Sequence, residues 1–317
     1  MPLIQPCAAV IPTRHRIEPL RRTFESLLEQ ETLPADLIIV DGSDQEENRT
    51  RDLCDQFRSQ FTVAGVDLVY QRAVCRGAAS QRNEGVAATD QPFILFLDDD
   101  ILLEARCIER LFNAIDSDSK IGAVSSMITN QKFELPGRLG RLVGRIVSAS
   151  SCHQKNWPGR YLGPAFTMLP DDDPALPEIV PVEWLNTTCT LYRTEALPSP
   201  PFPDFFYGGS FAEDFALSQL IRRDWKLANA RTARIFHDSQ PGDHKRNAKK
   251  IAAETAANWL RIMHHVTHET RRRDRARLAI VLAYRAMGNA FGPSGLRNLI
   301  PTLAGYLQGW RDATSRP

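Results

Sequence analysis

Cysteine is scarce in this 317-residue sequence, and the six cysteines form no Cys-x-x-Cys pair. No cluster of cysteines and histidines has the spacing of a structural zinc site, so neither zinc binding nor a disulfide framework is indicated. Instead we expect buried thiols in a reducing cytoplasm. The six residues are Cys7, Cys54, Cys75, Cys107, Cys152 and Cys189.

Long hydrophobic runs and an excess of one charge are also missing. No segment approaches the roughly 18 consecutive apolar residues of a membrane span, and no charged N-terminal region precedes a sustained apolar stretch, so we expect a protein that is neither secreted nor membrane-spanning. The 39 basic and 38 acidic residues leave a net charge of +1, which argues against a surface built throughout for nucleic acid. With 43% hydrophobic and 24% charged residues, the composition is that of a globular protein with one large domain or two fused units.

Short apolar runs alternate with amphipathic stretches over the first 130 residues. This alternation indicates βαβ units, an α/β fold class and a mostly parallel sheet covered by helices. The expected strands are 7–11, 37–40, 66–70, 93–97 and 121–127, and the expected helices are 17–30, 47–60, 78–88 and 104–116. Ligands of such sheets lie beyond the carboxyl ends of the strands, so the polar residues that follow each apolar run are the candidate site.

Three adjacent aspartates follow the fourth predicted strand. Their charges repel one another unless a cation lies among them, and Mg²⁺ or Mn²⁺ is the cation expected beside carboxylates and substrate phosphates. The i, i+2 spacing lets Asp98 and Asp100 point the same way while Asp99 points elsewhere. The alternative is a solvated turn in which Asp100 caps a helix.

Six motifs occur in the order typical of one enzyme family. They are AAVIPTRHR, LIIVDGSD, RGAASQRNEGVAAT, FILFLDDD, WLNTTCTLYRTEAL and FAEDFALSQLIRRDWKLANARTARIFHD. On these motifs the chain resembles glycosyltransferase family 2 over residues 7–240. The resemblance implies an inverting enzyme with the GT-A fold, a Rossmann-like, mostly parallel central sheet flanked by helices, with a C-terminal helical extension.

The resemblance also implies a division of the chain. The GT-A catalytic domain would cover 1–240, with a nucleotide-binding half at 1–128 and an acceptor half at 129–240. The helical extension would cover 241–317. Within the acceptor half, the Gly- and Pro-rich residues 129–180 predict a long variable or mobile loop.

The nucleotide-binding residues follow from the same resemblance. Pro12, Thr13 and Arg14 would contact the base, and Asp41 would accept hydrogen bonds from the uracil-like edge or the ribose. A simple Asx turn is the alternative for Asp41.

Two arginines and the aspartates would complete the nucleotide site. Arg76 and Arg82 would donate to the diphosphate or order the aspartate cluster, because guanidinium groups match phosphate and carboxylate oxygens. A surface pair is the alternative for Arg82. Asp98 and Asp99 would also contact the nucleotide.

The implied metal site consists of Asp98, Asp100 and His237, and the cofactor would be Mg²⁺ or Mn²⁺. His237 ends a strand-like run, where a histidine completes the metal site in part of the family. A structural histidine is the alternative.

Two acids begin an amphipathic segment in the acceptor half. In the family this pair carries the catalytic base, which would be Asp214, with Glu213 as acceptor ligand or substitute base; helix capping is the alternative. The acceptor segment would include Trp184, Asn186 and Thr187, although WLNTT departs from the glycine-rich stretch of many members.

The C-terminal segment combines a basic excess over 231–277, including Lys245-Arg246, with apolar residues at helical spacing. One interpretation is a basic amphipathic element at the inner face of the plasma membrane, near a lipid-linked acceptor. The other is a helix pair that packs on the catalytic domain or on a second subunit of a homodimer.

Taken together, the motifs predict a metal-dependent inverting glycosyltransferase. Its partners would be a nucleotide-sugar donor and a glycan or lipid-linked glycan acceptor, and we expect no nucleic acid. A sugar-1-phosphate nucleotidyltransferase would carry glycines after the first strand, where PTRHRIEPL has none. A non-catalytic glycan-binding module would tolerate loss of the acids, which are all present here.

Overall fold

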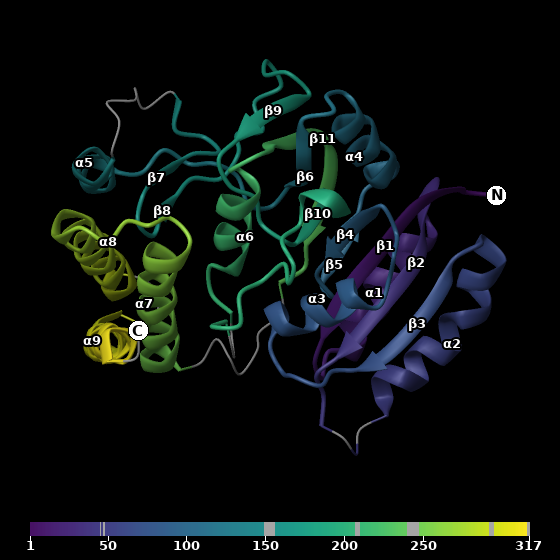
Figure 1. The fold of residues 1–317 in the computed structure, drawn as a ribbon, viewed down its shortest axis with the longest axis horizontal. Coiled ribbons are helices and arrows are strands. Elements are labelled where there is room, and N and C mark those ends of the chain that lie inside the picture. Colours follow the sequence, from purple (N-terminus) through teal and green to yellow (C-terminus); the bar gives the residue numbers. More distant parts are fainter. Residues whose placement is uncertain are drawn as a thin grey trace.

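A nine-stranded sheet forms the centre of the described part of the molecule (Figure 1). The structure, a computed structural model, describes residues 1–315 apart from 45, 47, 149–155, 207–209, 240–246 and 292–294. The strand order is β3-β2-β1-β4-β10-β6-β11-β5, with β9 also paired to β11. The strands are β1 (Leu3–Thr13), β2 (Thr32–Asp41), β3 (Asp67–Arg72), β4 (Phe93–Leu97), β5 (Ile101–Leu103), β6 (Ile121–Ile128), β9 (Ile179–Val182), β10 (Cys189–Arg193) and β11 (Lys226–His237).

Strand direction confirms the predicted class. Strands β1, β2, β3, β4, β6 and β11 point one way, while β5, β9 and β10 run against their neighbours. A separate pair, β7 (Tyr161–Gly163) and β8 (Phe166–Thr167), lies outside this sheet. The fold is therefore α/β with a mostly parallel central sheet.

Helices cover both faces of the sheet (Figure 1). They are α1 (Ile17–Leu28), α2 (Arg49–Ala64), α3 (Ala78–Ala87), α4 (Cys107–Asp116), α5 (Arg138–Val147), α6 (Glu213–Ile221), α7 (Ala248–His265), α8 (Arg272–Phe291) and α9 (Leu299–Ser315), with 3₁₀ turns η2 (Thr194–Ala196) and η4 (Gly295–Asn298). In β1, Ala8 and Val10 face the core under α3 and α6, while Ala9 and Ile11 face the core under α1 and α4. Because both faces are buried, the strands are continuous apolar runs.

The first four parallel strands end close together. Thr13 pairs with Asp41 across β1 and β2, and Asp41 pairs with Arg72 across β2 and β3. The aspartates that follow β4 begin beside β10, where Asp98 N donates to Thr188 O at 2.9 Å. The polar residues predicted as a site therefore share one edge of the sheet.

Residues 129–180 differ from the predicted loop. They contain α5, β7 and β8 and the start of β9, while 149–155 lie outside the described residues. The glycines mark close packing here: a Cβ on Gly144 would lie 2.6 Å from Trp157 Cη2, and one on Gly140 would lie 2.5 Å from the Tyr284 hydroxyl. Because glycine has no side chain, a helix can approach its neighbours this closely at a glycine. The glycines therefore serve helix packing, although the composition of the segment had indicated a loop.

The predicted C-terminal helices are present, and α7 packs against α6. The Trp259 ring of α7 lies 4.8 Å from the Phe215 ring of α6. Helix α9 lies directly against α7, because Cβ atoms on Gly305 and Gly309 would come within 2.2 and 2.0 Å of α7 carbonyl oxygens. The domain boundary near residue 240 stays a prediction, since 240–246, including Lys245 and Arg246, lie outside the described residues.

The buried-thiol prediction is confirmed for four cysteines and wrong for one. Cys7, Cys54, Cys107 and Cys189 are buried, but Cys75 is exposed in the loop after β3. Cys152 lies outside the described residues. Among the helices of the described ranges, none has the length and apolarity that a membrane crossing needs, and the cytoplasmic location stays a prediction.

Candidate functional site

Asp41 is fully buried at the end of β2 and accepts three hydrogen bonds. Its Oδ1 accepts from Ser43 N at 2.9 Å, which is the Asx turn considered from the sequence. Its Oδ2 accepts from the Tyr70 hydroxyl at 3.0 Å and from Arg72 Nη1 at 3.1 Å. Asp41 therefore connects the end of β2 to the turn at Ser43 and to Tyr70 and Arg72 of β3. Its contact with a nucleotide stays a prediction.

A polar cluster of Arg72, Asp44, Arg76 and His15 surrounds this strand end. Arg72 Nη1 donates to the backbone oxygens of Ser43 and Asp44 at 3.3 and 3.1 Å. Arg76, predicted to bind diphosphate, donates to Asp44 at 2.7 Å, and His15 Nε2 lies 3.4 Å from the same carboxylate. Arg72 belongs to the polar residues predicted as a site after the third strand, and strand register places it beside Asp41, whereas the sequence prediction missed His15.

The three aspartates after β4 have different partners. Asp99 accepts from the Thr13 hydroxyl at 2.6 Å and pairs with Arg16 Nη1 at 2.9 Å, while the other Arg16 nitrogen pairs with Asp100. Asp98 faces Arg82 instead, at 2.7 Å. Asp98 and Asp99 therefore have different partners, while Asp99 and Asp100 share Arg16. The helix-cap alternative for Asp100 is wrong, because strand β5 follows it.

Arg16 was missed by the sequence prediction, although it lies in the PTRHR motif. It brings a cation to Asp99 and Asp100, which are each 4% exposed. Burial raises the pKa of Asp99 to about 7, despite the opposing effects of Arg16 and the Thr13 hydrogen bond. Burial also acts to raise the pKa of Asp100, but His237 and Arg16 outweigh it and lower that pKa to about 2. The Asp100 carboxylate is thus stabilised in its charged form.

Asp98, Asp100 and His237 offer a donor set for a divalent cation. One ligand atom from each lies within 4.8 Å of the others. Strand pairing brings His237 here, since β11 runs beside β5 and places His237 opposite Ile101. The Gln131 amide contacts His237 Nδ1 at 2.8 Å and thereby orients the ring, with Nε2 3.2 Å from Asp100 Oδ1. Two carboxylates and one imidazole suit Mn²⁺ or Mg²⁺, so the residues present fit the predicted metal.

Arg82 connects the aspartates to the acidic pair of α6. Its side chain is 3% exposed; Nη2 donates to Asp98 at 2.7 Å and Nη1 to Glu213 at 3.1 Å. Burial alone would lower the pKa of Arg82, but the charges of Asp98 and Glu213 raise it, so the guanidinium stays charged. The surface-pair alternative for Arg82 is therefore wrong.

Glu213 and Asp214 are the first two residues of α6, and the pKa values of both are raised above the ordinary carboxyl range. Burial raises the pKa of Glu213 to about 8, and the neighbouring Asp214 charge adds to this while Arg82 opposes it. Burial raises the pKa of Asp214 to about 6, opposed by the hydrogen bond from Phe215 N. Carboxylates with raised pKa values in a buried cluster are candidates for proton transfer.

A strained turn presents this acidic pair. Ser210 and Ala212 have φ of +48° and +68°, a left-handed conformation that costs roughly 1–2 kcal/mol for each non-glycine residue. The turn is held from α7, where Asn258 Nδ2 donates to Phe211 O at 3.0 Å. The C-terminal helices thus support the turn that carries Glu213. Gly208 and Gly209, which precede this turn, lie outside the described residues.

The remaining predicted residues show mixed environments. Trp184 Nε1 donates to Met168 O at 2.9 Å, Asn186 Oδ1 accepts from Thr188 N at 3.2 Å, and Thr187 is 5% exposed. Pro12 is buried and Arg14 is exposed. Their contacts with acceptor or base stay predictions.

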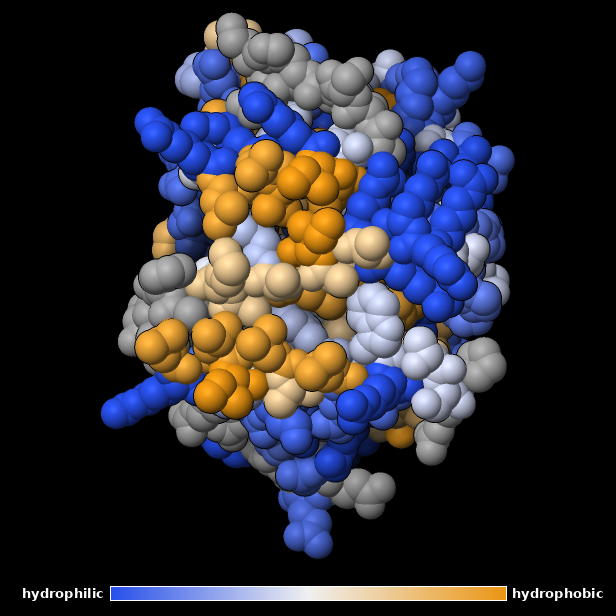
Figure 2. Space-filling view, turned by 90° about the vertical axis from the view of Figure 1, so that its left-hand side faces the viewer, coloured by the Kyte–Doolittle hydropathy of each residue, from blue (hydrophilic) through white to orange (hydrophobic). Residues whose placement is uncertain are grey.

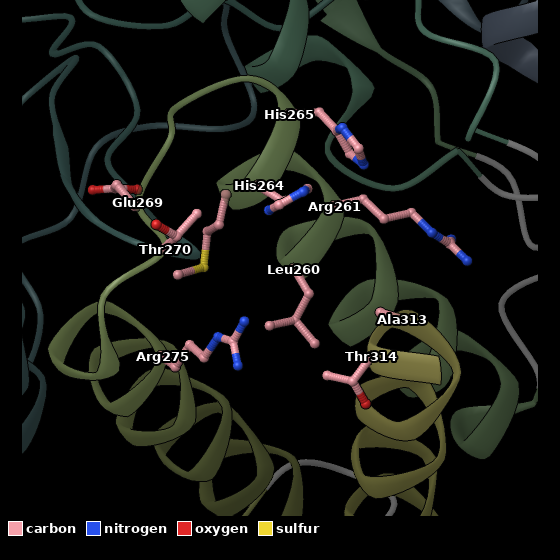
Figure 3. A pocket seen from close by; sticks show the side chains of 10 residues that line it. Leu260, Arg261, His264, His265, Glu269, Thr270, Arg275, Ala313 and Thr314 are labelled. Atoms are coloured by element: carbon pink, nitrogen blue, oxygen red, sulfur yellow. The ribbon is translucent and has the colours of Figure 1, made fainter. Parts of the chain in front are cut away.

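A cavity of about 190 Å³ lies elsewhere, between α7, α8 and α9 (Figure 3). Arg275 extends into it from α8 toward Leu260 of α7. Glu269 borders it and accepts from the Tyr161 hydroxyl at 2.6 Å. None of the predicted site residues lines this cavity, so it is separate from the strand-end site.

Comparison with known sequences identifies one family. The profile described as glycosyl transferase family 2 matches residues 8–169, which is half of the chain. Validoxylamine A glucosyltransferase of Streptomyces hygroscopicus subsp. limoneus is 29% identical over 107 residues, 34% of this chain. The match spans 23% of that relative's length.

Comparison with solved structures shows the same fold at low identity. Residues 1–349 of S. aureus TarS match with a TM-score of 0.53 and 13% identity, covering 96% of this chain and 80% of that one. The mannosyltransferase PcManGT from Pyrobaculum calidifontis, solved with GDP-Man and Mn²⁺, matches with a TM-score of 0.53 and 15% identity, covering 98% and 75%. TarS 1–349 was also solved with UDP-GlcNAc, and that structure matches with a TM-score of 0.52 and 13% identity, covering 96% and 81%.

Proposed function

The chain belongs to glycosyl transferase family 2 and has the GT-A fold, and we propose that it is a metal-dependent, inverting glycosyltransferase. The donor would be a UDP, dTDP or GDP sugar, and the transferred group a hexosyl or deoxyhexosyl residue. The acceptor would be a hydroxyl of a glycan or lipid-linked glycan in cell-surface polysaccharide biosynthesis. The nucleotide sugars bound by the two solved relatives support a donor of this class.

The donor side of the reaction is assigned to the strand-end residues. Asp98, Asp100 and His237 would hold Mn²⁺ or Mg²⁺, which when bound supplies a Lewis acid that neutralises the diphosphate leaving group. Arg76, whose side chain is 51% exposed, would release Asp44 and donate hydrogen bonds to phosphate oxygens.

The acceptor side is assigned to the start of α6. Asp214, with a pKa near 6, is ionised at neutral pH and still basic enough to take the proton of the acceptor hydroxyl. The acceptor oxygen forms its bond to the anomeric carbon on the face opposite the leaving group, as the bond to the diphosphate oxygen breaks. Glu213, with its higher pKa, would hold the acceptor by a hydrogen bond.

The single observation that carries this proposal is the buried Arg82 bridge between Asp98 and Glu213. It connects Asp98, one of the proposed metal ligands, to the helix that carries the proposed base through a single guanidinium. A buried charge of this kind is stable only when it is paired, and here its partners are the acids assigned to the donor and acceptor sides.

A donor panel tests the proposal. Purified protein would be incubated with UDP, dTDP and GDP sugars and Mn²⁺, and release of nucleoside diphosphate measured. One donor should be consumed, and the Asp100→Asn variant should lose at least 100-fold in rate. The Asp90→Asn variant, which changes an exposed aspartate in the loop before β4, is the matched control and should be fully active.

A further inference from the structure

A broad apolar face covers the side of the molecule formed by α5, α8, η4 and α9. Of the sixteen large hydrophobic side chains that are exposed in the described residues, ten lie on these elements or just before α5. Figure 2 shows two orange areas on this side of the molecule, joined by a paler band and bordered by blue, hydrophilic side chains. Such clustering on one face marks an interaction site, because exposed apolar residues are otherwise scattered.

The exposed apolar residues follow the periodicity of their helices. On α5, Leu139, Leu142 and Ile146 recur at intervals of three and four residues and are 48–52% exposed. Between η4 and α9, Leu296 and Ile300 are 74% and 76% exposed and begin a second stripe at the same spacing. Both stripes therefore form continuous helical faces.

These stripes are not needed to hold the helices on the protein. Helix α5 is already anchored by Val143 and Val147, which are buried in the core. Helix α9 is anchored by Gly305 and Gly309, which press on the α7 backbone. Each helix thus has a second apolar face directed outward.

The elements that carry this face have a strong excess of basic residues, although Arg275 extends into the cavity between α7, α8 and α9 and Glu134 adjoins Leu135. Helices α5, α8 and α9 with η4 carry ten arginines and two aspartates, and no lysine or glutamate. One aspartate, Asp274, is buried and lies 3.6 Å from Arg277. On α5, Arg138, Arg141 and Arg145 alternate with the apolar stripe. A second copy of the chain would bring arginines against arginines, whereas lipid phosphates complement them.

We propose that this face binds peripherally to an anionic lipid bilayer. The leucines and isoleucines of α5, η4 and α9 enter the boundary between headgroups and acyl chains, and the arginines contact lipid phosphates. The proposal assigns α5, which lies in the expected variable loop, to the same surface as the C-terminal helices. It stands independently of the glycosyltransferase activity.

Vesicle flotation tests the proposal with the full chain. We expect binding to vesicles of phosphatidylcholine with 30% phosphatidylglycerol and little binding to phosphatidylcholine alone. The double variant Leu296→Ser/Ile300→Ser should weaken binding more than tenfold, while Leu3→Ser/Val63→Ser, which changes exposed apolar residues on other elements, should not. The Arg138→Gln and Arg297→Gln changes should each weaken binding about fivefold, and 0.5 M salt should act in the same direction.

Two results would overturn the proposal. The first is a wild-type chain that does not bind the anionic vesicles, a result that depends on no variant. The second is a stable dimer in light scattering that Leu296→Ser/Ile300→Ser converts to a monomer without any change in vesicle binding, because the face would then belong to a second copy. A thermal melt of each variant checks that it is folded. If Leu296→Ser/Ile300→Ser unfolds the chain, the Arg138→Gln and Arg297→Gln variants still test the proposal.

Discussion

Arg82 Nη1 donates to Glu213 Oε1 over 3.1 Å, although the two residues are 131 positions apart in the sequence. The same guanidinium donates to Asp98, so one buried group joins α3, the end of β4 and the start of α6. The donor and acceptor halves of the proposed site are thereby held in a fixed relation.

Removing this bridge should damage both stability and activity. The Arg82→Met change leaves Asp98 without its counter-charge and Glu213 without its hydrogen-bond donor, and it should lower the free energy of unfolding by about 3 kcal/mol, measured in urea. Arg82→Lys keeps the charge, but one ammonium cannot span both acids, so kcat should fall at least tenfold with a smaller loss of stability. The exposed Arg106→Met change serves as control. Full activity of Arg82→Lys would show that the bridge is not needed.

Substitutions of the two acids of α6 should have different effects on catalysis and on binding. Asp214→Asn removes the base and should lower kcat by about 10³ while the Kd for the nucleoside diphosphate, measured by calorimetry, changes less than about twofold. Glu213→Gln keeps a hydrogen-bonding group and should chiefly raise the KM for the acceptor. Equal loss of transfer and nucleotide binding in Asp214→Asn would remove Asp214 from the base role.

The raised pKa values set the sign of the pH dependence. A base acts in its deprotonated form, so kcat/KM should increase with pH as Asp214 loses its proton around pH 6. Below that point the rate should fall about tenfold per pH unit, and the residual rate of Asp214→Asn should lack this limb. A profile that is flat from pH 5 to 8, or that rises toward acid, contradicts the assignment.

Loss of His237 should weaken metal binding directly. In His237→Ala the donor set is reduced to two carboxylates, so the Kd for Mn²⁺, measured by electron paramagnetic resonance, should rise about 10- to 100-fold. His264→Ala, on the exposed side of α7, is the matched control. Unchanged Mn²⁺ affinity in His237→Ala would assign the ring a structural role.

The turn before α6 should depend on α7. Asn258→Ala removes the hydrogen bond to Phe211 O and should cost about 1 kcal/mol of stability. Because the turn positions Glu213, we also expect a lower kcat and a higher acceptor KM, with donor binding unchanged. A stability loss without any kinetic change would limit Asn258 to folding.

The strand ends could be predicted because local patterns determine them. The runs that contain Val10, Ile39 and Leu95 are apolar on both faces, so they mark buried strands, and Asp41 and Asp98 mark their ends. The same rule placed Asp98 and Asp100 together at one edge.

The rest of the site depends on contacts between distant segments. Arg16 meets Asp100 across 84 positions, and no local signal distinguishes Arg16 from Arg14, which is exposed. At Gly144 the sequence predicted a loop where the structure has helix α5. This glycine makes room for Trp157, but the sequence alone does not distinguish it from a glycine in a loop. Ion pairs and packing contacts between distant segments depend on the tertiary structure, and local sequence patterns and composition do not reveal them.

Proton NMR of the donor reaction measures both the stereochemistry of transfer and its dependence on metal. The protein would be incubated with its donor sugar and Mn²⁺, with water as a slow acceptor, and the anomeric proton of the first-formed sugar followed against release of the nucleoside diphosphate. An α-linked donor should give the β-sugar first, and chelation of the metal should stop the reaction. A first-formed α-sugar, or an undiminished rate after chelation, would contradict the proposed mechanism.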